Sequence, residues 1–358
     1  FIVMISNKWM IYGANGFSGS LAVDEACKRG LTPTLAGRSQ SIRDLAKSKN
    51  LESQIFSLSS VNEVASQIKG MAVVANCAGP FSETAEIMIQ ACIQAKVHYI
   101  DITGEISVYD YANQCDREAV SAGIVLCPGV GSDVIPTDCL AKYLKDECPD
   151  ATHLKMGWHI VGSKASKGTA KTSVQGLFLG GKVRENGQIK QVPLAYKEKV
   201  IDFGVGKFNT MTIPWGDVFT AYHSTGIPNI EFYISRPPKS VKKIKRYRRF
   251  IGLFNYKWVV GLLQNWIERN WKQPTAEIRE KGKSFFWGEV KDPNGQVVTA
   301  RFSTGDGYDV TAVGVVVVAE YLLQDHSQKG YYTPSILMGK ELVKKIPRYS
   351  GIEIIKNE

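Results

Sequence analysis

A glycine-rich turn near the N-terminus limits what this chain can fold into more than any other feature. A short apolar segment, Trp9–Tyr12, predicts a strand, and an amphipathic pattern from Leu21 to Gly30 predicts a helix. The residues between them are Gly13, Ala14, Asn15, Gly16, Phe17, Ser18 and Gly19. Because glycine lets a pyrophosphate approach the N–H groups of a helix N-terminus, this order predicts a dinucleotide-binding domain. The alternative is a purely structural turn.

Short apolar segments alternate with helical patterns through the first third of the chain. Further strands are predicted at Thr34–Gly37, Met71–Ala75, Tyr99–Asp101 and Gly123–Leu126. Strands that alternate with helices form a parallel sheet covered on both faces. We therefore expect residues 1–136 to form a Rossmann-type α/β domain with a doubly wound parallel sheet.

The pattern changes after residue 136, which indicates a second domain. Longer alternating segments follow at Leu154–Val161, Val192–Phe203, Ile230–Ser235, Ser284–Val290 and Val297–Ser303. The last two flank an Asn-Gly pair, which favours a tight hairpin turn. We expect residues 137–329 to form an α+β domain with a mainly antiparallel sheet. Val310–Leu323 and Ser335–Ile346 predict closing helices, and the C-terminal helix within 330–358 is expected to pack back on the first domain.

The end of the second strand favours NADP(H) over NAD(H). An NAD enzyme has Asp or Glu there to bind the ribose 2′-OH. This chain has Arg38 and Ser39, and its next acid is Asp44. A guanidinium can make a forked contact with a 2′-phosphate, and the Ser39 hydroxyl can add another. The alternative is that Arg38 stacks on adenine or lies in solvent.

Two further loops follow strands whose carboxyl ends should face the cofactor. Their expected cofactor-binding residues are Ala78, Gly79, Pro80, Phe81, Thr103 and Gly104. Small residues let the backbone approach the nicotinamide ribose. Each loop is also compatible with an ordinary turn.

In their order and spacing, these segments resemble the saccharopine dehydrogenase-like oxidoreductases. The segments are 13–19, 36–39, 78–81, 99–105 and 131–138, with 167–170, 305–308 and 332–334 further along the chain. The closer resemblance is to the branch that contains the trans-acting enoyl reductases and the animal saccharopine dehydrogenase-like protein. It implies a Rossmann domain, an α+β substrate domain and a nicotinamide cofactor. The family name comes from an amino-acid enzyme, whereas this branch is associated with acyl or lipid-linked chemistry.

Candidate catalytic residues are few. None of the fifteen tyrosines has a lysine four positions later, which excludes the short-chain dehydrogenase pair. Thr169 and Lys171 supply a hydroxyl and an amine in the second domain, and Asp101 lies at a strand end. The alternatives are a helix N-terminus capped by Thr169, a solvated Lys171, and a carboxylate at Asp101 that serves as a cap or salt-bridge partner.

The excess positive charge of the chain is concentrated in one segment. The formal net charge is +10, and seven cations lie close together: Lys239, Lys242, Lys243, Lys245, Arg246, Arg248 and Arg249. A mostly apolar helix is predicted directly after them, at Phe250–Trp271. This insert, residues 239–271, favours contact with an anionic membrane surface or an acyl carrier protein. A core or homodimer-interface helix with a solvated basic loop is the alternative, and nucleic acid is not expected.

The amino-acid composition indicates the class of protein and the cellular compartment to expect. A chain of 358 residues with 44% hydrophobic and 22% charged residues is typical of a two-domain globular protein. The seven cysteines include no CxxC pair, and the five histidines have no metal-ligand spacing, so neither a disulfide framework nor a metal is expected. The first apolar stretch is too short for a signal-peptide core. We expect a cytoplasmic location, with peripheral membrane attachment as an alternative.

These observations, together with what the family resemblance implies about the substrate, predict an NADP(H)-dependent oxidoreductase that reduces a double bond in an acyl, polyketide or lipid-linked substrate. One alternative is a saccharopine dehydrogenase-type imine reductase acting on an amino-acid-linked substrate. Such an enzyme needs several Arg or Lys for two substrate carboxylates, and no such cluster occurs outside the insert. The other alternative is a non-catalytic NADP-binding protein at lipid surfaces.

Overall fold

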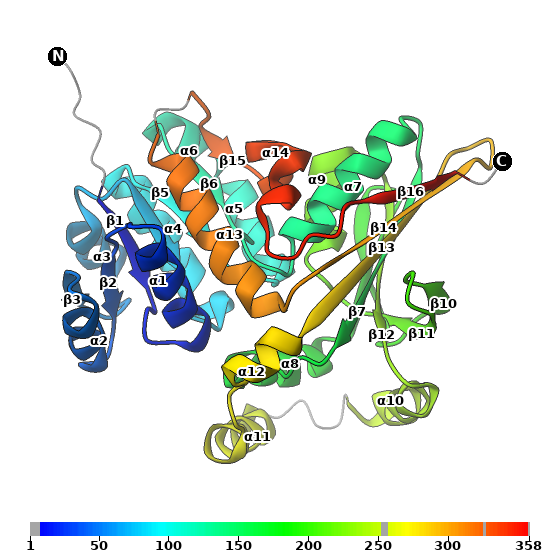
Figure 1. Cartoon of the computed structure of the whole chain (residues 1–358), viewed down its shortest axis with the longest axis horizontal. Coiled ribbons are helices and arrows are strands. Elements are labelled where there is room, and N and C mark those ends of the chain that lie inside the picture. The colour runs from blue at the N-terminus through cyan, green and yellow to red at the C-terminus, as the bar shows by residue number, and fades with distance from the viewer. Residues whose placement is uncertain (1–7, 252–256, 325–326, 357–358) are drawn as a thin grey trace. The chain divides into compact units, whose positions relative to one another are not determined.

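The computed structural model describes residues 8–251, 257–324 and 327–356, and the chain divides into two compact units (Figure 1). Unit 1 comprises residues 1–135 and 308–347, and unit 2 comprises 136–307 and 348–358. Residues 308–329, which we expected in the second domain, therefore belong to unit 1. The chain leaves unit 1 once and returns to it.

Unit 1 is built on a parallel sheet of seven strands in the described part of the chain, in the order β15-β6-β5-β4-β1-β2-β3. The strands are β1 (Trp9–Tyr12), β2 (Thr34–Gly37), β3 (Ser53–Ile55), β4 (Val73–Asn76), β5 (His98–Asp101), β6 (Val125–Cys127) and β15 (Gly330–Tyr331). β1 pairs with both β2 and β4, so the strand order reverses at β1. This arrangement confirms the predicted doubly wound fold, in which ligands bind at the carboxyl ends beside that reversal.

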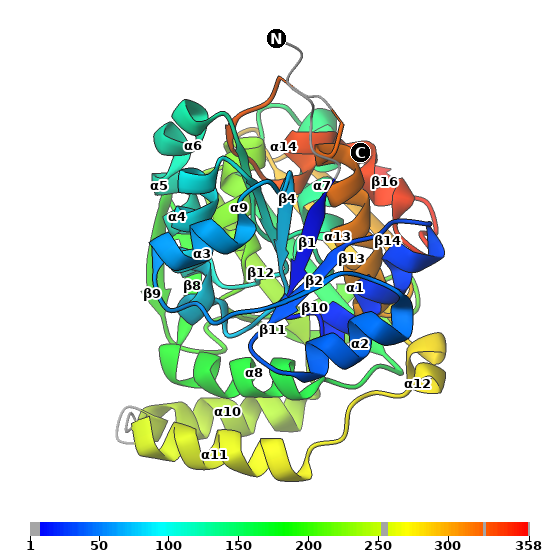
Figure 2. The ribbon, with the colours of Figure 1, turned by 90° about the vertical axis from the view of Figure 1, so that its left-hand side faces the viewer.

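Helices cover both faces of this sheet (Figure 2). On one side lie α3 (Val61–Ile68), α4 (Phe81–Ala95), α5 (Ile106–Gln114) and α6 (Asp116–Ala122). On the other lie α1 (Phe17–Lys28) and α13 (Gly307–Leu322), joined at one end by an Arg29–Glu320 ion pair of 3.0 Å. Because both faces are covered, β1, β2 and β4 are buried along their whole length. Unit 1 also contains α2 (Ser41–Lys49), which follows β2.

The last part of the chain differs from the expected single C-terminal helix. β15 completes the sheet beside β6, and α14 (Pro334–Met338) is followed by a 3-10 helix, η2 (Lys340–Lys345). Gly339, with φ of 81°, separates the two short helices. β16 (Glu353–Lys356) pairs with β14 of unit 2. Of the segment 330–358, which we expected to pack on the first domain, residues 330–347 belong to unit 1 and 348–358 to unit 2.

Unit 2 contains a sheet of nine strands in the described residues, in which β12 and β7 form a parallel pair and the other pairs are antiparallel. Besides β16 it contains β7 (His153–Val161), β8 (Gly181–Glu185), β9 (Gln188–Val192), β10 (Glu198–Asp202), β11 (Lys207–Thr212), β12 (Asn229–Ser235), β13 (Lys283–Lys291) and β14 (Val297–Thr304). The predicted α+β domain is confirmed. The expected continuous strand Val192–Phe203 is wrong, because the chain leaves the ladder at Pro193, which has no N–H to donate.

The basic insert forms two helices of unit 2. α10 (Pro238–Ile251) contains the cations, and α11 (Lys257–Asn270) contains most of the predicted apolar helix, while residues 252–256 of that helix lie outside the described residues. Unit 2 also contains α7 (Ile135–Glu147), α8 (Lys167–Leu179), α9 (Asp217–Thr225) and α12 (Ala276–Lys281). Among the described residues, no helix is both long enough and apolar enough to span a bilayer.

Candidate functional site

Two glycines of the turn after β1, Gly13 and Gly19, are packed too closely to accept a side chain. Gly13 has φ of +79°, and its N–H donates to the carbonyl of Ala36 over 2.8 Å. A Cβ at Gly13 would lie 2.8 Å from the backbone nitrogen of Ala78, and a Cβ at Gly19 would lie 2.2 Å from the carbonyl oxygen of Gly13. The turn, the first turn of α1 and the loop after β4 are therefore in direct backbone contact, as a dinucleotide cradle requires.

The N-terminus of α1 is suited to an anion from outside the chain. Its N-cap residue, Gly16, makes no side-chain capping hydrogen bond, and the first turn contains no acid. By contrast, Ser60 caps α3 and Ser166 caps α8 through their side chains. A helix N-terminus concentrates positive dipole charge and N–H groups without intrahelical acceptors. The predicted stretch from Gly13 to Gly19 thus forms one corner, called the anion-binding corner below because an anion is the ligand that it suits.

A cation and two hydroxyls lie at the end of β2. Arg38 and Ser39 are exposed, and the hydroxyls of Ser39 and Ser41 are 2.9 Å apart. The Asn15 side-chain amide donates to the Ser41 hydroxyl over 2.9 Å, which joins the glycine turn to this corner. Asp44 lies inside α2. A guanidinium with adjacent hydroxyls and no acid at the strand end fits a 2′-phosphate better than a bare ribose 2′-OH.

The loop after β4 is held by the Asn76 and Thr84 side chains. The N–H of Ala78 donates to Asn76 Oδ1 over 3.1 Å, and the Thr84 hydroxyl donates to the Ala78 carbonyl over 2.7 Å. The Gly79–Pro80 peptide bond is cis. The position of Ala78 against Gly13 brings this loop to the glycine turn, as predicted from its place after a strand.

The N-terminus of α4, which follows this loop, already holds a carboxylate of the chain. Glu105 accepts hydrogen bonds from the N–H of Phe81 over 2.9 Å and from that of Ser82 over 3.0 Å. The N-terminus of α4 is therefore closed by Glu105, whereas that of α1 has no capping side chain and no acid in its first turn. Of these two helices, α1 is thus the one whose N-terminus could accept an external anion.

Asp101 ties together the loops that follow β5 and β6. Its side chain accepts hydrogen bonds from the Tyr99 hydroxyl over 2.6 Å, the Thr103 N–H over 3.0 Å and the Gly129 N–H over 2.9 Å. The residue is 1% exposed, and burial raises the pKa of its carboxyl to about 6. With both carboxylate oxygens engaged by these donors, Asp101 positions the loop that carries Thr103 and Gly104.

Asp133 is a second carboxyl group at the same edge, in the loop after β6. A Cβ at Gly104 would lie 2.8 Å from Asp133 Oδ2, so this carboxyl lies directly against the predicted cofactor loop. Burial raises the pKa of Asp133 to about 6, although its side chain is partly exposed. The N–H of Ser132 donates to the Thr311 hydroxyl of α13 over 3.0 Å, which fixes this loop. The sequence placed Asp133 near a strand end without selecting it as a site residue.

Tyr308 is a residue that sequence reasoning did not select. It lies in the first turn of α13, and its ring meets that of Phe17 edge to face, with centroids 4.9 Å apart. Phe17 begins α1, so α13 starts beside the anion-binding corner. In the sequence, Tyr308 was included only in the segment 305–308, one of those on which the family resemblance rests.

Thr169 and Lys171 lie on α8 of unit 2. Ser166 is the N-cap residue: its side chain accepts the Thr169 N–H over 3.2 Å, so Thr169 is not the cap that the alternative interpretation expected. The ammonium of Lys171 is 2.6 Å from Glu268 Oε2, in an ion pair with α11. Lys171 is therefore paired with a carboxylate of its own unit, in an ion pair that is itself partly exposed.

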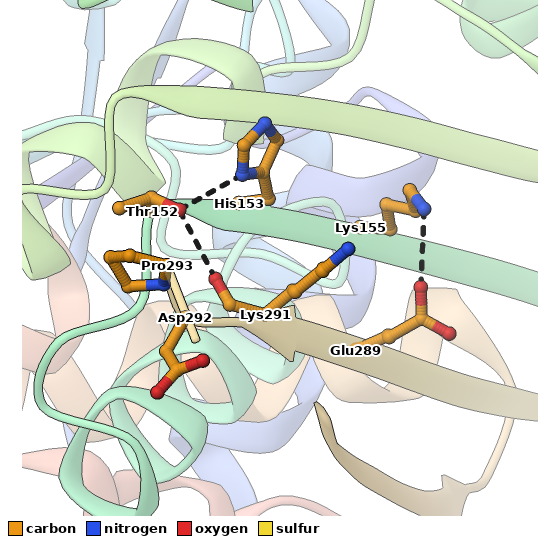
Figure 3. A pocket seen from close by; sticks show the side chains of 7 residues that line it. All are labelled: Thr152, His153, Lys155, Glu289, Lys291, Asp292 and Pro293. Carbon is orange, nitrogen blue, oxygen red and sulfur yellow. Dashed lines mark hydrogen bonds and ion pairs between the residues drawn. The ribbon is translucent and has the colours of Figure 1, made fainter. Parts of the chain in front are cut away.

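A pocket of about 350 Å³ opens on unit 2, where β7 begins and β13 ends (Figure 3). Its lining residues are Thr152, His153, Lys155, Glu289, Lys291, Asp292 and Pro293. Charges of both signs line it, and Lys155 donates to Glu289 over 3.2 Å. None of the predicted site residues lines this pocket. Across the described ranges, no group of three metal-ligating side chains comes together.

Comparison with known proteins supports the cofactor assignment. Residues 9–127 match the family model described as the saccharopine dehydrogenase NADP binding domain. Together with the open α1 N-terminus and the Arg38 corner, this match identifies an NADP(H)-binding domain. The predicted cofactor is thus confirmed.

Relatives and solved structures agree with this match. The lipid droplet localized protein of Caenorhabditis elegans is 25% identical over 191 residues, which are 47% of this chain and 44% of that protein. The saccharopine dehydrogenase-like oxidoreductase of Homo sapiens is 27% identical over 162 residues, 38% of this chain and 37% of that one. The chain spans less than half the length of these relatives. Apo saccharopine dehydrogenase (L-Glu forming) from Saccharomyces cerevisiae has the same fold, with a TM-score of 0.65 at 13% identity over 97% of this chain and 99% of that one.

Proposed function

We propose that this chain, a relative of the saccharopine dehydrogenase-like oxidoreductases, is an NADP(H)-dependent reductase. Its substrate in this proposal contains a double bond in an acyl, polyketide or lipid-linked chain, as in the trans-acting enoyl reductases. The observation that carries the cofactor part is Arg38, an exposed cation at the end of β2 where an NAD site has an acid. The chain binds NADP(H) in this corner, with the pyrophosphate at the N-terminus of α1 and the 2′-phosphate at Arg38 and Ser39.

The residues of the cofactor edge mainly bind and orient. The small residues Ala78, Gly79 and Gly104 let the backbone approach the nicotinamide ribose, and Asp101 holds the loop of Thr103 in place. Reduction of an enoyl group adds a hydride to the β-carbon and a proton to the α-carbon. Bound NADPH supplies the hydride, and holding the acceptor in line with it provides much of the rate gain.

We assign the proton to Asp133. Its carboxyl group lies against Gly104, is partly exposed and has a pKa raised to about 6 by burial, so it is more often protonated, and thus available as a proton donor, near pH 6 than an ordinary Asp, which is almost fully ionised there. Asp101 has a similar pKa but is 1% exposed and engaged by three donors. We therefore treat Asp101 as a positioning residue. Lys171 is held in its ion pair with Glu268, so we leave Lys171 and the neighbouring Thr169 outside the proposed chemistry.

The lipid-linked substrate class has its own support. One relative carries the name lipid droplet localized protein, and the family branch that the motifs resemble is associated with acyl chemistry. The names of the other relatives favour the amino-acid-linked alternative, an imine reductase of the saccharopine type. The two substrate classes differ in charge, because saccharopine carries several carboxylates and an enoyl thioester tail is apolar.

One set of binding and activity measurements tests the proposal. Native mass spectrometry of the purified chain should find co-purified NADP(H), and NADPH absorbance should fall with an α,β-unsaturated acyl thioester but not form from NADP⁺ with saccharopine. Arg38→Ala should weaken NADPH binding by about 1.5–3 kcal/mol and leave NADH binding nearly unchanged. Arg43→Ala, an exposed arginine of α2, is the matched control and should leave both unchanged.

Two results would contradict the proposal separately. Equal losses of NADPH and NADH binding in Arg38→Ala would remove the 2′-phosphate assignment. Turnover of saccharopine without turnover of any enoyl thioester would replace the acyl substrate with the amino-acid-linked one.

A further inference from the structure

We propose that the outward faces of α10 and α11 bind an anionic lipid surface. This basic–apolar surface consists of Lys239, Lys242, Lys243, Arg246 and Tyr247 of α10 and Leu262, Leu263 and Trp266 of α11. The inference concerns where the protein works and goes beyond the reaction it catalyses. It holds or fails whatever the substrate is.

One face of α10 attaches it to unit 2. Val241 is fully buried in a small apolar cluster with Met211 and Ile234. On the same face, Lys245 pairs with Glu198 of β10 at 2.5 Å, and Arg248 donates to the Leu194 carbonyl over 2.8 Å. Lys245 and Arg248 are thus inward-directed cations that hold the helix in place.

The opposite face of α10 presents the other described cations to solvent. Lys239, Lys242, Lys243 and Arg246 are exposed, and Tyr247 is 51% exposed beside them. Residues 238–251 include no acid. A helix with one attached face and one cationic face gives a local positive field along about two helical turns, which attracts anionic headgroups.

α11 is likewise attached by one face. Ile267 is 4% exposed, and Glu268 pairs with Lys171 at 2.6 Å and with Lys167 at 3.5 Å, both on α8. Just beyond the helix, the indole N–H of Trp271 donates to the Ala165 carbonyl over 2.7 Å. These contacts fix which face of α11 looks outward.

Three large apolar side chains of α11 are exposed, beside the exposed polar residues Asn265 and Arg269. Leu262 is 60% exposed, Leu263 is 41% exposed and Trp266 is 56% exposed. A helix on a globular domain normally turns its apolar stripe inward, because exposing such side chains to water is unfavourable. Two leucines and a tryptophan left in water on neighbouring turns therefore indicate a surface that is covered in use.

The two helices can meet one surface together. In Figures 1 and 2, both lie along the same lower edge of unit 2, and their axes run across that edge rather than into it. Helices that lie flat in this way can present the exposed cations of α10 and the exposed apolar side chains of α11 to one surface. Interfacial helices have this combination, with cations at the headgroups and tryptophan and leucine at the acyl boundary.

Charge decides among the possible occupants. A second copy of this chain brings the same excess of positive charge, +10 in total, so pairing through this surface would place cations against cations. An acidic carrier protein would match the cations of α10, but it does not require the exposed tryptophan and leucines of α11. An anionic lipid surface matches both helices at once.

Vesicle flotation of the full chain tests this inference. Wild-type protein should bind phosphatidylcholine vesicles that contain phosphatidylserine, bind pure phosphatidylcholine vesicles far less, and lose binding as NaCl is raised. Changing Lys239, Lys242, Lys243 and Arg246 to Ser should lower the partition coefficient about tenfold or more, because each cation near the surface contributes to binding. The matched control changes the exposed Lys28, Lys47, Lys69 and Lys207 to Ser, which removes the same charge and should leave binding within about twofold.

A second variant tests the apolar part. Leu262→Ser together with Trp266→Ala should also lower the partition coefficient severalfold, with the thermal unfolding temperature unchanged because both side chains are exposed. Equal vesicle binding by wild type and the four-serine variant would overturn the proposal. So would binding of an acidic carrier protein without vesicle binding, or a dimer in light scattering that the apolar variant converts to monomer.

Discussion

At the scale of single residues, Asp101 illustrates why a carboxyl group at a strand end need not be catalytic. Its three hydrogen-bond donors come from β5 and from the loops after β5 and β6. Burial outweighs these donors and raises the pKa from 3.8 to about 6. The group therefore stabilises the loop geometry and carries an electrostatic cost when it is ionised.

This cost predicts a pH dependence of stability. Between 3.8 and about 6 the folded state binds more protons at Asp101 than the unfolded state, so the free energy of unfolding falls as pH rises through this window. Asp101→Asn keeps an acceptor for both N–H donors and cannot ionise. Across the whole of this pH window, the unfolding free energy of wild type should fall by roughly 3 kcal/mol more than that of Asp101→Asn. Urea unfolding at about pH 4 and about pH 7 measures the difference.

Asp133 titrates in the same direction in both proteins, so the wild-type-minus-variant difference isolates Asp101. An identical decline in wild type and Asp101→Asn would mean that Asp101 ionises as easily in the folded chain as in the unfolded one.

At the scale of elements, the N-termini of α4 and α1 differ in whether a side chain of the protein provides a negative charge there. α4 receives it from Glu105, and α1 has neither a capping side chain nor a first-turn acid. The helix that remains open is the one that follows the glycine turn. In the proposed site, the internal carboxylate at α4 leaves α1 as the N-terminus for the pyrophosphate.

Removing the internal cap should destabilise α4. Glu105→Ala leaves the N–H groups of Phe81 and Ser82 without their acceptor, which should lower the free energy of unfolding by about 1–2 kcal/mol. Glu86→Ala, at an exposed position of the same helix, controls for the loss of a charge and should have little effect. Chemical denaturation of the three proteins measures this. Equal stability of Glu105→Ala and Glu86→Ala would show that the cap contributes nothing.

At the scale of the whole molecule, unit 1 depends on a return of the chain after unit 2. α13 buries an almost continuous valine run and supplies Thr311 and Tyr308 to the cofactor edge. At Gly314 the helix approaches residues 130 and 135 so closely that a Cβ would lie 2.3 Å from the Val130 carbonyl oxygen. A segment far along the sequence therefore completes the first domain.

This close approach predicts a large effect of one methyl group. Gly314→Ala should destabilise the protein by about 1–3 kcal/mol, because either α13 or the loop at Val130 must move. Gly261→Ala in α11 is the matched control: a Cβ there meets nothing within 4 Å, and alanine favours helix by up to about 1 kcal/mol. Thermal unfolding compares them. A Gly314→Ala protein as stable as wild type would mean that α13 packs less tightly on unit 1.

The sequence by itself determined the features that depend on neighbouring residues. β1 and β2 have the predicted bounds, because a short apolar run in each ends at glycine or at the turn. The glycine turn and the absence of an acid after β2 are likewise local, and they predicted the fold class and the cofactor. β3 and β15 were missed because strands of three and two residues show no measurable alternation.

Only the tertiary structure decided which residues meet across long separations. It paired Glu105 with the start of α4, Tyr308 with Phe17, and Lys171 with Glu268. It also divided the basic cluster into cations that hold α10 and cations that face solvent. These contacts depend on how the elements pack once distant parts of the chain have come together. The free energy of a contact between distant segments cannot be read from the residue pattern of either segment alone.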